Sequence, residues 1–516
     1  MRVGILFVYV DYHRKGERRR FAMQPQIGPL LAGLLPTDID VDIVNETWQE
    51  PDWSKDYDLL FLSCMHSDFD RARQISHYWR RRGAKTVLGG SFASSYPTLC
   101  QPYFDAIAVG DPEGIIGALY RDFCAGALQS LYVSSDYAGA AVATPRFDLV
   151  AGRTAHALCF EATRGCPFTC EFCVLTGLGT RHHTRSVQAV LRDIAQGQAM
   201  LQGRVPRYQR NIIGFCDNNI GGDLTYLREL CRALTPLNVQ WYGAATFNVV
   251  ANRELVPLLA RSGCRALFVG LESFNPATLD AMHKHQNVPH KIKAAIDNCR
   301  DHGILIVSGL MVSPLTDDVA YIRRIPEYLA ECGLTVPTFI CFETPIPGTP
   351  YFLRLAGEAN SPFLPNALLR DFSGYTLVVE PTLTSTDEFL DAYRATVRDV
   401  YSLRNKARKL AADLPRFLKQ GAWFPALVDG IDVCAAKPIP AAGRSLIAGT
   451  DTPPPEKVPL TQSDFESEQE QRKIMTPWQV TDNQGRLLNA WLHPNKVFDS
   501  ELEKALRRQG RIGGAA

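Results

Sequence analysis

The sequence has almost no excess of charge of either sign. Its 55 Lys and Arg residues balance 54 Asp and Glu residues, which leaves a net charge of +1 over 516 residues. Proteins that bind nucleic acids or membrane surfaces electrostatically concentrate charge of one sign, so neither partner is expected here. Long hydrophobic runs are also missing: none could span a bilayer, and the opening Val3–Val10 is too short for a signal-peptide core. The sequence therefore predicts a cytoplasmic protein.

Cysteines at short spacing are scarce as well. The chain has 14 cysteines, but outside one run they are scattered singly, as in a reducing compartment, where a buried free cysteine behaves as a small hydrophobic side chain. No second Cys-x2-Cys accompanies that run. His182-His183 and His283-Lys-His285 lack the i,i+4 spacing of a zinc-binding helix. These patterns argue against a disulfide framework and against a closed zinc site.

The exception is a run of three thiols at Cys166, Cys170 and Cys173. It follows an apolar, strand-like segment at 157–160, and loops at the carboxyl ends of strands are where parallel α/β folds place their chemistry. Three thiolates can hold three irons of a cubane cluster, whereas fully ligated clusters usually have four cysteines. The run therefore predicts a cluster with one iron open to a small molecule. A zinc site and three unrelated buried thiols are the alternatives.

This Cys-x3-Cys-x2-Cys spacing, with the aromatic Phe172 before the last cysteine, resembles the cluster motif of the radical S-adenosylmethionine (SAM) enzymes. The resemblance implies a 4Fe–4S cluster whose open iron binds the amino and carboxylate groups of SAM. It also implies an external electron donor of the flavodoxin or ferredoxin type, and reductive cleavage of SAM to a 5'-deoxyadenosyl radical.

Apolar runs of strand length alternate with helical patterns over residues 1–128, which predicts a doubly wound, Rossmann-like parallel sheet. Ligands of such sheets bind at the carboxyl ends of the strands, where small residues let a bulky ligand approach the backbone. The expected strands are Val3–Val10, Val41–Val44, Leu59–Leu62, Thr86–Leu88 and Ala106–Val109, and the expected helices are Ile27–Leu35, Phe69–Arg82 and Glu113–Phe123.

Gly89-Gly90-Ser91 and Gly110-Asp-Pro-Glu113 follow two of the expected strands. At these turns this half resembles the cobalamin-binding domain that precedes the radical SAM domain in a large subgroup of the family. The resemblance departs at Ser91-Phe92, where no histidine follows the glycines. Asp11-Tyr-His13-Arg-Lys-Gly16 matches the signature by which other cobalamin proteins supply a lower axial histidine, but a basic loop follows it instead of a helix. His13 is therefore either the cobalt ligand or a solvated loop residue. The N-terminal domain as a whole either binds cobalamin or only docks against the radical SAM domain. The other cobalamin-contacting candidates are Ser63, Ser67, Gly89, Gly90, Ser91, Gly110 and Glu113.

After a linker at 129–156, six βα-type units between 157 and 352 predict an open partial (β/α)6 barrel. By resemblance, Glu272 would contact the ribose or amino group of SAM, Asp217 its methionyl part, and Ser308 and Met311 its adenine end. Ordinary polar strand ends are the alternative. Thr344-Pro-Ile-Pro-Gly-Thr-Pro350 is very similar to a turn of the cobalamin-type subgroup. The expected strands are 157–160, Ile212–Phe215, Gln240–Phe247, Ala266–Val269, Ile304–Met311 and Thr338–Phe342.

Residues 353–516 are expected to be mainly helical and to cover the barrel mouth. Helices are predicted at Asp387–Arg404 and Asn405–Leu418, and an exposed connector at Thr461–Arg472. The resemblance as a whole implies a cobalamin-dependent radical SAM C-methyltransferase. Such an enzyme moves a methyl group from SAM via methylcobalamin to an unactivated carbon of a natural product, lipid or tetrapyrrole. The alternatives are a radical rearrangement, cyclisation or ring contraction without methyl transfer, and a non-catalytic cluster-bearing scaffold.

Overall fold

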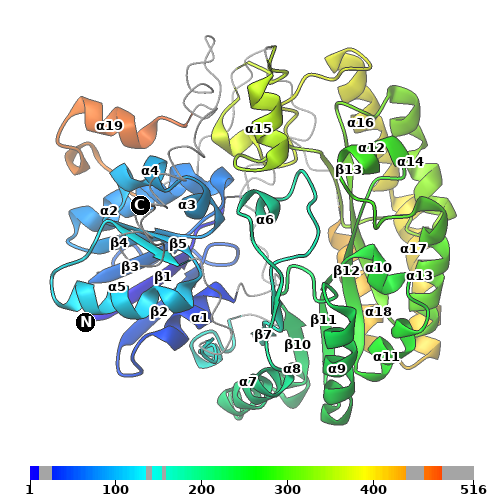
Figure 1. Cartoon of the computed structure of the whole chain (residues 1–516), viewed down its shortest axis with the longest axis horizontal. Helices are drawn as coiled ribbons and strands as arrows, with labels where there is room; N and C mark the ends of the chain where they lie inside the picture. The colour runs from blue at the N-terminus through cyan, green and yellow to red at the C-terminus, as the bar shows by residue number, and fades with distance from the viewer. Residues whose placement is uncertain are drawn as a thin grey trace, which may run out of the picture.

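Two parallel sheets of six strands each organise the chain and lie beside one another in Figure 1. The computed structural model describes residues 1–10, 26–134, 142–153, 158–358, 360–365, 367–436 and 458–478. The α/β architecture predicted from the sequence, with an N-terminal doubly wound sheet and a second parallel sheet, is confirmed. His13 lies outside the described residues, so its role stays a prediction.

The first sheet has the strand order β2-β1-β3-β4-β5-β6, all parallel. Its central strands are buried on both faces, as in β3, where Leu59–Leu62 read as an unbroken apolar run. All five predicted strands are present with shifted ends, whereas β6 was not predicted and forms inside the expected linker. The strands are β1 (Arg2–Phe7), β2 (Asp40–Asn45), β3 (Leu59–Ser63), β4 (Lys85–Gly89), β5 (Ala106–Gly110) and β6 (Leu131–Ser134).

Helices cover both faces of this sheet. In Figure 1, α1 and α5 lie side by side on one face, and α2, α3 and α4 lie on the other. The helix predicted from Glu113 begins later, because Pro112–Gly114 forms a 3-10 turn first. The bounds are α1 (Ile27–Leu34), α2 (Phe69–Arg81), α3 (Ser91–Ser95), α4 (Pro97–Cys100) and α5 (Ile116–Cys124).

The second sheet has the order β14-β13-β12-β11-β10-β7, again all parallel, with β7 and β14 at its edges. The six predicted strands are therefore confirmed as one open sheet. The strand predicted at Gln240–Phe247 stops earlier, because Phe247 begins a short helix, α10 (Phe247–Val250). The strands are β7 (Cys159–Phe160), β10 (Ile212–Phe215), β11 (Gln240–Ala245), β12 (Cys264–Glu272), β13 (Leu305–Val312) and β14 (Phe339–Phe342).

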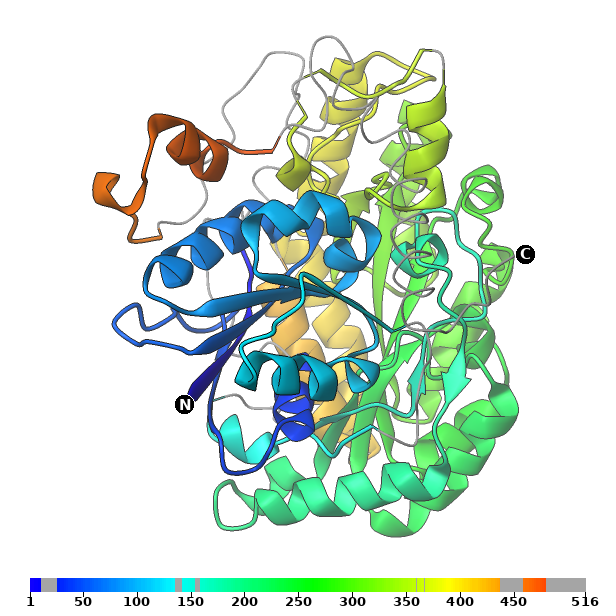
Figure 2. The ribbon, with the colours of Figure 1, turned by 60° about the vertical axis from the view of Figure 1, so that its left-hand side comes forward.

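The outer face of this sheet is covered by helices, and C-terminal helices extend the layer (Figures 1 and 2). Phe417 and Ala426 pack against Ala266 and Leu305 at the starts of β12 and β13, so this part of the C-terminal region closes the amino-terminal end of the sheet. The short helix α15 lies beside the carboxyl end instead. The bounds are α7 (Val187–Met200), α9 (Leu224–Leu234), α11 (Leu255–Arg261), α13 (Ile292–Asp301), α14 (Val319–Glu331), α15 (Pro350–Gly357), α16 (Thr386–Val400), α17 (Leu403–Lys419) and α18 (Trp423–Ala435).

The last described segment returns to the first domain. The helix α19 (Glu468–Met475) packs on α2, as Figure 2 shows. Arg73 donates to the backbone carbonyls of Lys473 and Thr476, and Ile474 is buried. The expectation of a mere connector at Thr461–Arg472 is thus wrong, although most of these residues are exposed. No helix in the described part of the chain combines the length and apolar character needed to cross a bilayer.

The carboxyl end of β5 offers a test of the packing between β5 and β6. Gly110 has a φ of +90°, and a Cβ there would stand 1.8 Å from the carbonyl oxygen of Ser134. Gly126 also has a positive φ (+68°), but a Cβ there would meet nothing within 4 Å. We expect Gly126→Ala to cost about 1 kcal/mol of unfolding free energy through backbone strain alone. Gly110→Ala should cost roughly 3 kcal/mol, because overpacking adds to that strain. Urea denaturation of both variants measures the difference in unfolding free energy. Equal losses in the two variants would show that the close approach of Gly110 to Ser134 does not limit the residue at this position.

Candidate active site

The three-cysteine loop leaves the second sheet just after β7. A two-residue antiparallel ladder closes the loop, since β8 (Thr163–Arg164) pairs with β9 (His183–Thr184). Gly165 begins the loop with a φ of +78°, and a Cβ there would stand 2.1 Å from the carbonyl oxygen of Arg181. Glycine is therefore the residue that lets the two arms of the loop approach each other.

The structure places the three predicted cysteine ligands on this loop. Cys170 is buried, and Cys166 and Cys173 are half-buried. Burial raises the pKa of Cys170 and of Cys173, and the neighbouring thiols, Cys173 and Cys166 respectively, raise them further. Asn219 donates its side-chain N–H to the sulfur of Cys166 at 3.6 Å. Within the described ranges, no three His, Cys, Asp or Glu side chains converge as a single metal ion requires; a cubane instead takes one thiolate on each of several irons.

A buried ion pair faces this loop. Glu272 ends β12 with a φ of +64°, which is uncommon for a residue other than glycine. Its Oε1 accepts a hydrogen bond of 2.6 Å from Nζ of Lys284. The same ammonium lies 5.6 Å from the centroid of the Phe172 ring, and it lowers the pKa of Cys170 and Cys173 against the larger effect of burial. Two of the predicted SAM residues, Glu272 and Phe172, therefore meet at one lysine.

The other predicted SAM residues are spread around the second sheet. Asp217 follows β10 and is buried; its carboxylate accepts the backbone N–H groups of Ala162 and Thr163, and burial raises its pKa to about 7. Ser308 on β13 is buried, and its hydroxyl has no hydrogen-bond partner in the described structure. Met311, on the same strand, is half-buried. Asp217 thus holds the chain that enters the cysteine loop, while Ser308 offers an unused polar group.

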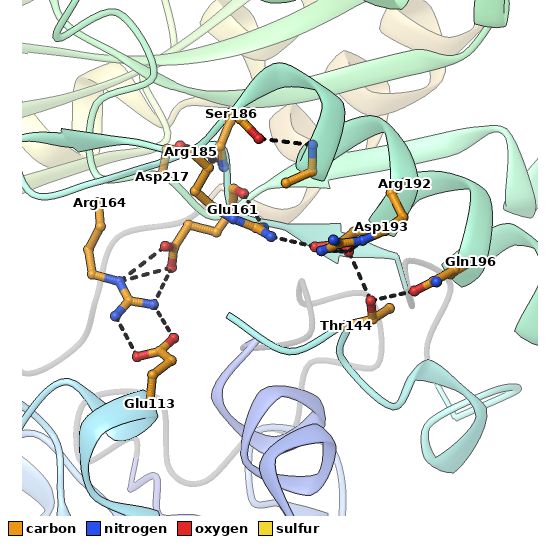
Figure 3. Close-up of polar contacts among 12 residues, drawn as sticks. Glu113, Thr144, Glu161, Arg164, Arg185, Ser186, Arg192, Asp193, Gln196 and Asp217 are labelled. Atoms are coloured by element: carbon orange, nitrogen blue, oxygen red, sulfur yellow. Dashed lines mark hydrogen bonds and ion pairs between the residues drawn. The ribbon is translucent and has the colours of Figure 1, made fainter. Parts of the chain in front are cut away.

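Arg164, two residues before the first cysteine, ties the loop to the first sheet (Figure 3). Its guanidinium lies 2.7 Å from Oδ1 of Asp111, 2.8 and 2.9 Å from the two carboxylate oxygens of Glu113, and 3.0 Å from Oε2 of Glu161. Asp111 and Glu113 follow β5, whereas Glu161 follows β7. Carboxylates from both sheets therefore fix the entry to the cysteine loop.

Small residues form part of the carboxyl edge of the first sheet, where cobalamin contacts are predicted. Ser63 and Gly89 end β3 and β4, and Gly90 and Ser91 follow directly. Gly90 has a φ of +99°, and a Cβ there would stand 3.1 Å from Oγ of Ser63. None of these four residues is buried, and Ser67 is half-buried. The backbone of β3 and β4 is therefore accessible at this edge.

Two other groups at the same edge already contact other segments. The side chain of Glu113, a predicted cobalamin contact, is fully buried against Arg164. His66 is buried, and its Nε2 donates to the carbonyl oxygen of Phe372 at 2.6 Å; burial lowers the pKa of His66 to about 4, so the ring is neutral. Both side chains thus join the first sheet to the rest of the chain.

The sequence pattern did not reveal Arg164 or Lys284. Arg164 lies four residues after the end of β7, and nothing in the local sequence links it to Glu113. Lys284 lies between His283 and His285, which were weighed only as metal ligands. The available signal for Arg164 was a cation two residues before the cysteine run, whereas Lys284 lies far from the run in the sequence and had no such signal.

An open parallel sheet with a three-cysteine loop after its first strand defines a class of iron–sulfur enzymes. Residues 160–324 match the family model described as the radical SAM superfamily, so this part of the chain is a radical SAM domain. A radical SAM domain implies a 4Fe–4S cluster and SAM. The loop fits that group because it carries three thiols, and the charge of Cys173 acts on Cys170 while that of Cys166 acts on Cys173.

Relatives and a solved structure give further context. The chain is 25% identical over 331 residues to bacteriochlorophyllide d C-8(2)-methyltransferase of Chlorobaculum tepidum, covering 62% of this chain and 73% of the relative. It is 24% identical over 357 residues to hopanoid C-2 methylase of Rhodopseudomonas palustris, covering 65% of each. Its fold is similar to that of the cobalamin-dependent SAM radical enzyme OxsB with aqua-cobalamin and SAM bound. That match has a TM-score of 0.57 and 12% identity, and covers 100% of this chain and 82% of that one.

The Arg164 ion pairs predict a large loss of stability on substitution. Arg164→Met leaves three carboxylates without their shared cation, and breaking such a buried pair costs about 3 kcal/mol or more. Arg192→Met is the matched control: Arg192 also contacts a carboxylate, that of Asp193 at 3.0 Å, but its side chain is 53% exposed. An exposed pair contributes at most about 1 kcal/mol. Urea denaturation of the two full-length variants measures both effects, and similar costs would show that the bridge does not stabilise the fold.

Proposed function

We propose that this protein is a cobalamin-dependent radical SAM C-methyltransferase that acts on an unactivated carbon of a small molecule. The observation that carries the proposal is the join at Arg164, which attaches a three-thiol loop to the carboxyl edge of a doubly wound sheet. Ligands of such sheets bind at this edge. The family match supports the SAM chemistry, and the methyltransferase names of the relatives support methyl transfer.

In this proposal Cys166, Cys170 and Cys173 hold the 4Fe–4S cluster. Bound there, the cluster supplies single electrons for cleaving SAM, and cobalamin supplies a carrier for the methyl group. An external donor of the flavodoxin or ferredoxin type provides the electrons. The protein positions these groups and excludes water from them, which is its usual contribution in cofactor enzymes.

The SAM site is proposed at the carboxyl end of the second sheet. Glu272 and Phe172 meet beside the cysteine loop, where Glu272 can accept hydrogen bonds from the ribose or amino group. Ser308 has a buried hydroxyl without a partner in the described structure, which fits a ligand contact on β13 near Met311. Asp217 is proposed for the methionyl end; its hydrogen bonds to Ala162 and Thr163 give it a second task in holding the loop.

The cobalamin site is proposed along the edge formed by Ser63, Gly89, Gly90 and Ser91. Their small side chains suit a large flat ring that must approach the backbone closely. Ser67 and Gly110 extend this edge. Glu113 supports it indirectly, because its carboxylate already binds Arg164. His13 remains the proposed lower ligand of cobalt or a loop residue without that role.

The substrate is proposed to be a natural product, lipid or tetrapyrrole. Two relatives are named for a bacteriochlorophyllide and a hopanoid, which are both large and mostly apolar. Residues 353–516 are proposed to help shape the pocket through α15, whose Arg354 donates to the carboxylate of Glu171 on the cysteine loop at 2.7 and 3.0 Å. The proposed domain limits are those predicted from the sequence, except that the first domain extends through β6 (Leu131–Ser134), which pairs with β5.

Product analysis tests the proposal. The full chain is purified anaerobically with cobalamin, reconstituted with iron and sulfide, and reduced in the presence of SAM. Formation of both 5'-deoxyadenosine and S-adenosylhomocysteine is the expected result. Deoxyadenosine alone would favour a rearrangement without methyl transfer, and neither product would favour a scaffold.

Cys170→Ala should abolish the cluster absorbance and all SAM cleavage, because one iron of the cubane loses its thiolate. Cys216→Ala is the matched control, since Cys216 is half-buried and follows β10 of the same sheet but lies outside the run. We expect it to retain the cluster and both products. SAM cleavage that persists in Cys170→Ala would refute the ligand assignment, and loss of the cluster in Cys216→Ala would point to a fourth cysteine ligand.

A further inference from the structure

Lys284 is a buried cation next to the cysteine loop. It lies in the turn after α12 (Pro276–Ala281) and is 6% exposed. Its Nζ donates to Oε1 of Glu272 at 2.6 Å. The ammonium also lies over the ring of Phe172, a residue that stands between Cys170 and Cys173 in the sequence. A buried ammonium is costly unless it is paired. The pair with Glu272 therefore keeps a positive charge buried beside the loop.

Hydrogen bonds to backbone carbonyls, one donated by a backbone N–H and two by a side-chain amide, fix this charge from two sides. The backbone N–H of Glu171 donates to the carbonyl oxygen of Met282 at 3.2 Å, which attaches the turn to the cysteine loop. Asn287 donates to the carbonyl oxygens of Gly270 and Leu271 at 2.9 and 2.7 Å, which attaches the other end of the turn to β12. The position of the ammonium is thus set by both the loop and the strand that ends in Glu272.

The strand end is itself irregular. Glu272 has a positive φ, and the register between β12 and β13 shifts between Gly270 and Glu272. A left-handed conformation costs a residue with a Cβ about 1 to 2 kcal/mol. Such strain persists where the surroundings enforce it, and it is concentrated at functional sites. Here it aims the Glu272 carboxylate at Lys284.

The other charges facing the loop have partners of their own. Glu171 binds Arg354 at 2.7 and 3.0 Å, and Arg164 binds carboxylates from both sheets. Lys284 and Glu272 are the pair whose fields both act on Cys170. Adding an electron to a cluster adds negative charge, and cluster potentials depend on the surrounding charge, hydrogen bonds and exposure. A fixed cation whose field reaches Cys170 and Cys173 favours the reduced form of a cluster held there.

We propose that Lys284 is a positioning residue that raises the reduction potential of the cluster held by Cys166, Cys170 and Cys173. Glu272 holds the ammonium in place and partly opposes its effect. One electron passes from the external one-electron donor to the cluster, and Lys284 stabilises the added charge without changing its own covalent state. The inference rests on the proposed cluster and adds a named residue that tunes it.

Potentiometric titration of the reconstituted full chain, followed by electron paramagnetic resonance without SAM, tests this. Lys284→Met should make the cluster harder to reduce by at least about tenfold in the equilibrium constant, which is about 59 mV for one electron. Glu272→Gln keeps the cation and removes the opposing charge, so its potential should shift the other way. The double variant should lie between the two. Lys293→Met is the control, because Lys293 pairs with Asp297 on the surface.

A merely structural role of the ion pair would not shift the reduction potential in opposite directions in Lys284→Met and Glu272→Gln. Iron and sulfide content is measured in every variant, so that loss of the cluster is not mistaken for a change of potential. If Lys284→Met cannot assemble the cluster, Glu272→Gln tests the inference alone: a higher reduction potential supports it, and a lower one contradicts it. Unchanged potentials in variants that retain the cluster would overturn the inference and leave the proposed function intact. Failure of the unmodified protein to assemble any cluster would instead refute the proposed function.

Discussion

The guanidinium of Arg164 is the contact on which the arrangement of the whole site depends. One planar cation satisfies carboxylates from two separate sheets, and it binds Glu113 through two parallel hydrogen bonds. A lysine could not make this set of contacts, because its single ammonium lacks the fork geometry. Since Arg164 is followed at once by Gly165 and Cys166, any shift of the first sheet is transmitted to the first thiol of the loop.

The bridge continues away from the loop, as Figure 3 shows. Arg185 donates to the backbone carbonyl of Glu161 at 2.9 Å and to Asp193 on α7 at 2.6 Å. Asp193 in turn accepts a hydrogen bond from Thr144 at 2.8 Å, within the segment that joins the two sheets. The connecting segment is therefore tied into the same network as the loop.

The sequence revealed the sheets better than it revealed their contacts. Strands such as Leu59–Leu62 are recognisable because a central parallel strand is buried on both faces and is apolar throughout. The strand β6 was not predicted, because four residues at a sheet edge carry too little periodicity to stand out from a linker. The helix α19 was not predicted, because its exposed face is rich in charge and only Ile474 is buried.

The same division holds within the site. The cysteine spacing identifies the loop, since the chemistry of a cluster demands several thiols close together. No local pattern could show that Glu113 binds Arg164, 51 residues away in sequence, or that Lys284 reaches Glu272. Asp217 lies at the predicted strand end, yet its carboxylate binds the backbone of Ala162 and Thr163. Long-range pairing of polar groups depends on the finished fold, which propensity and periodicity do not encode.

The ion pairs around the loop also bear on how the site can work. Replacing a buried pair by apolar side chains of similar volume is often neutral or stabilising, so the pairs at Arg164 and Lys284 are not explained by stability alone. They supply charges whose positions are fixed before any reaction begins, and such charges stabilise a change in charge without reorganising. The ion pair between Glu171, which is largely buried, and the half-exposed Arg354 adds a fixed charge from α15. A loop held by three ion pairs, at Arg164, Lys284 and Arg354, suits a group whose charge changes by one electron.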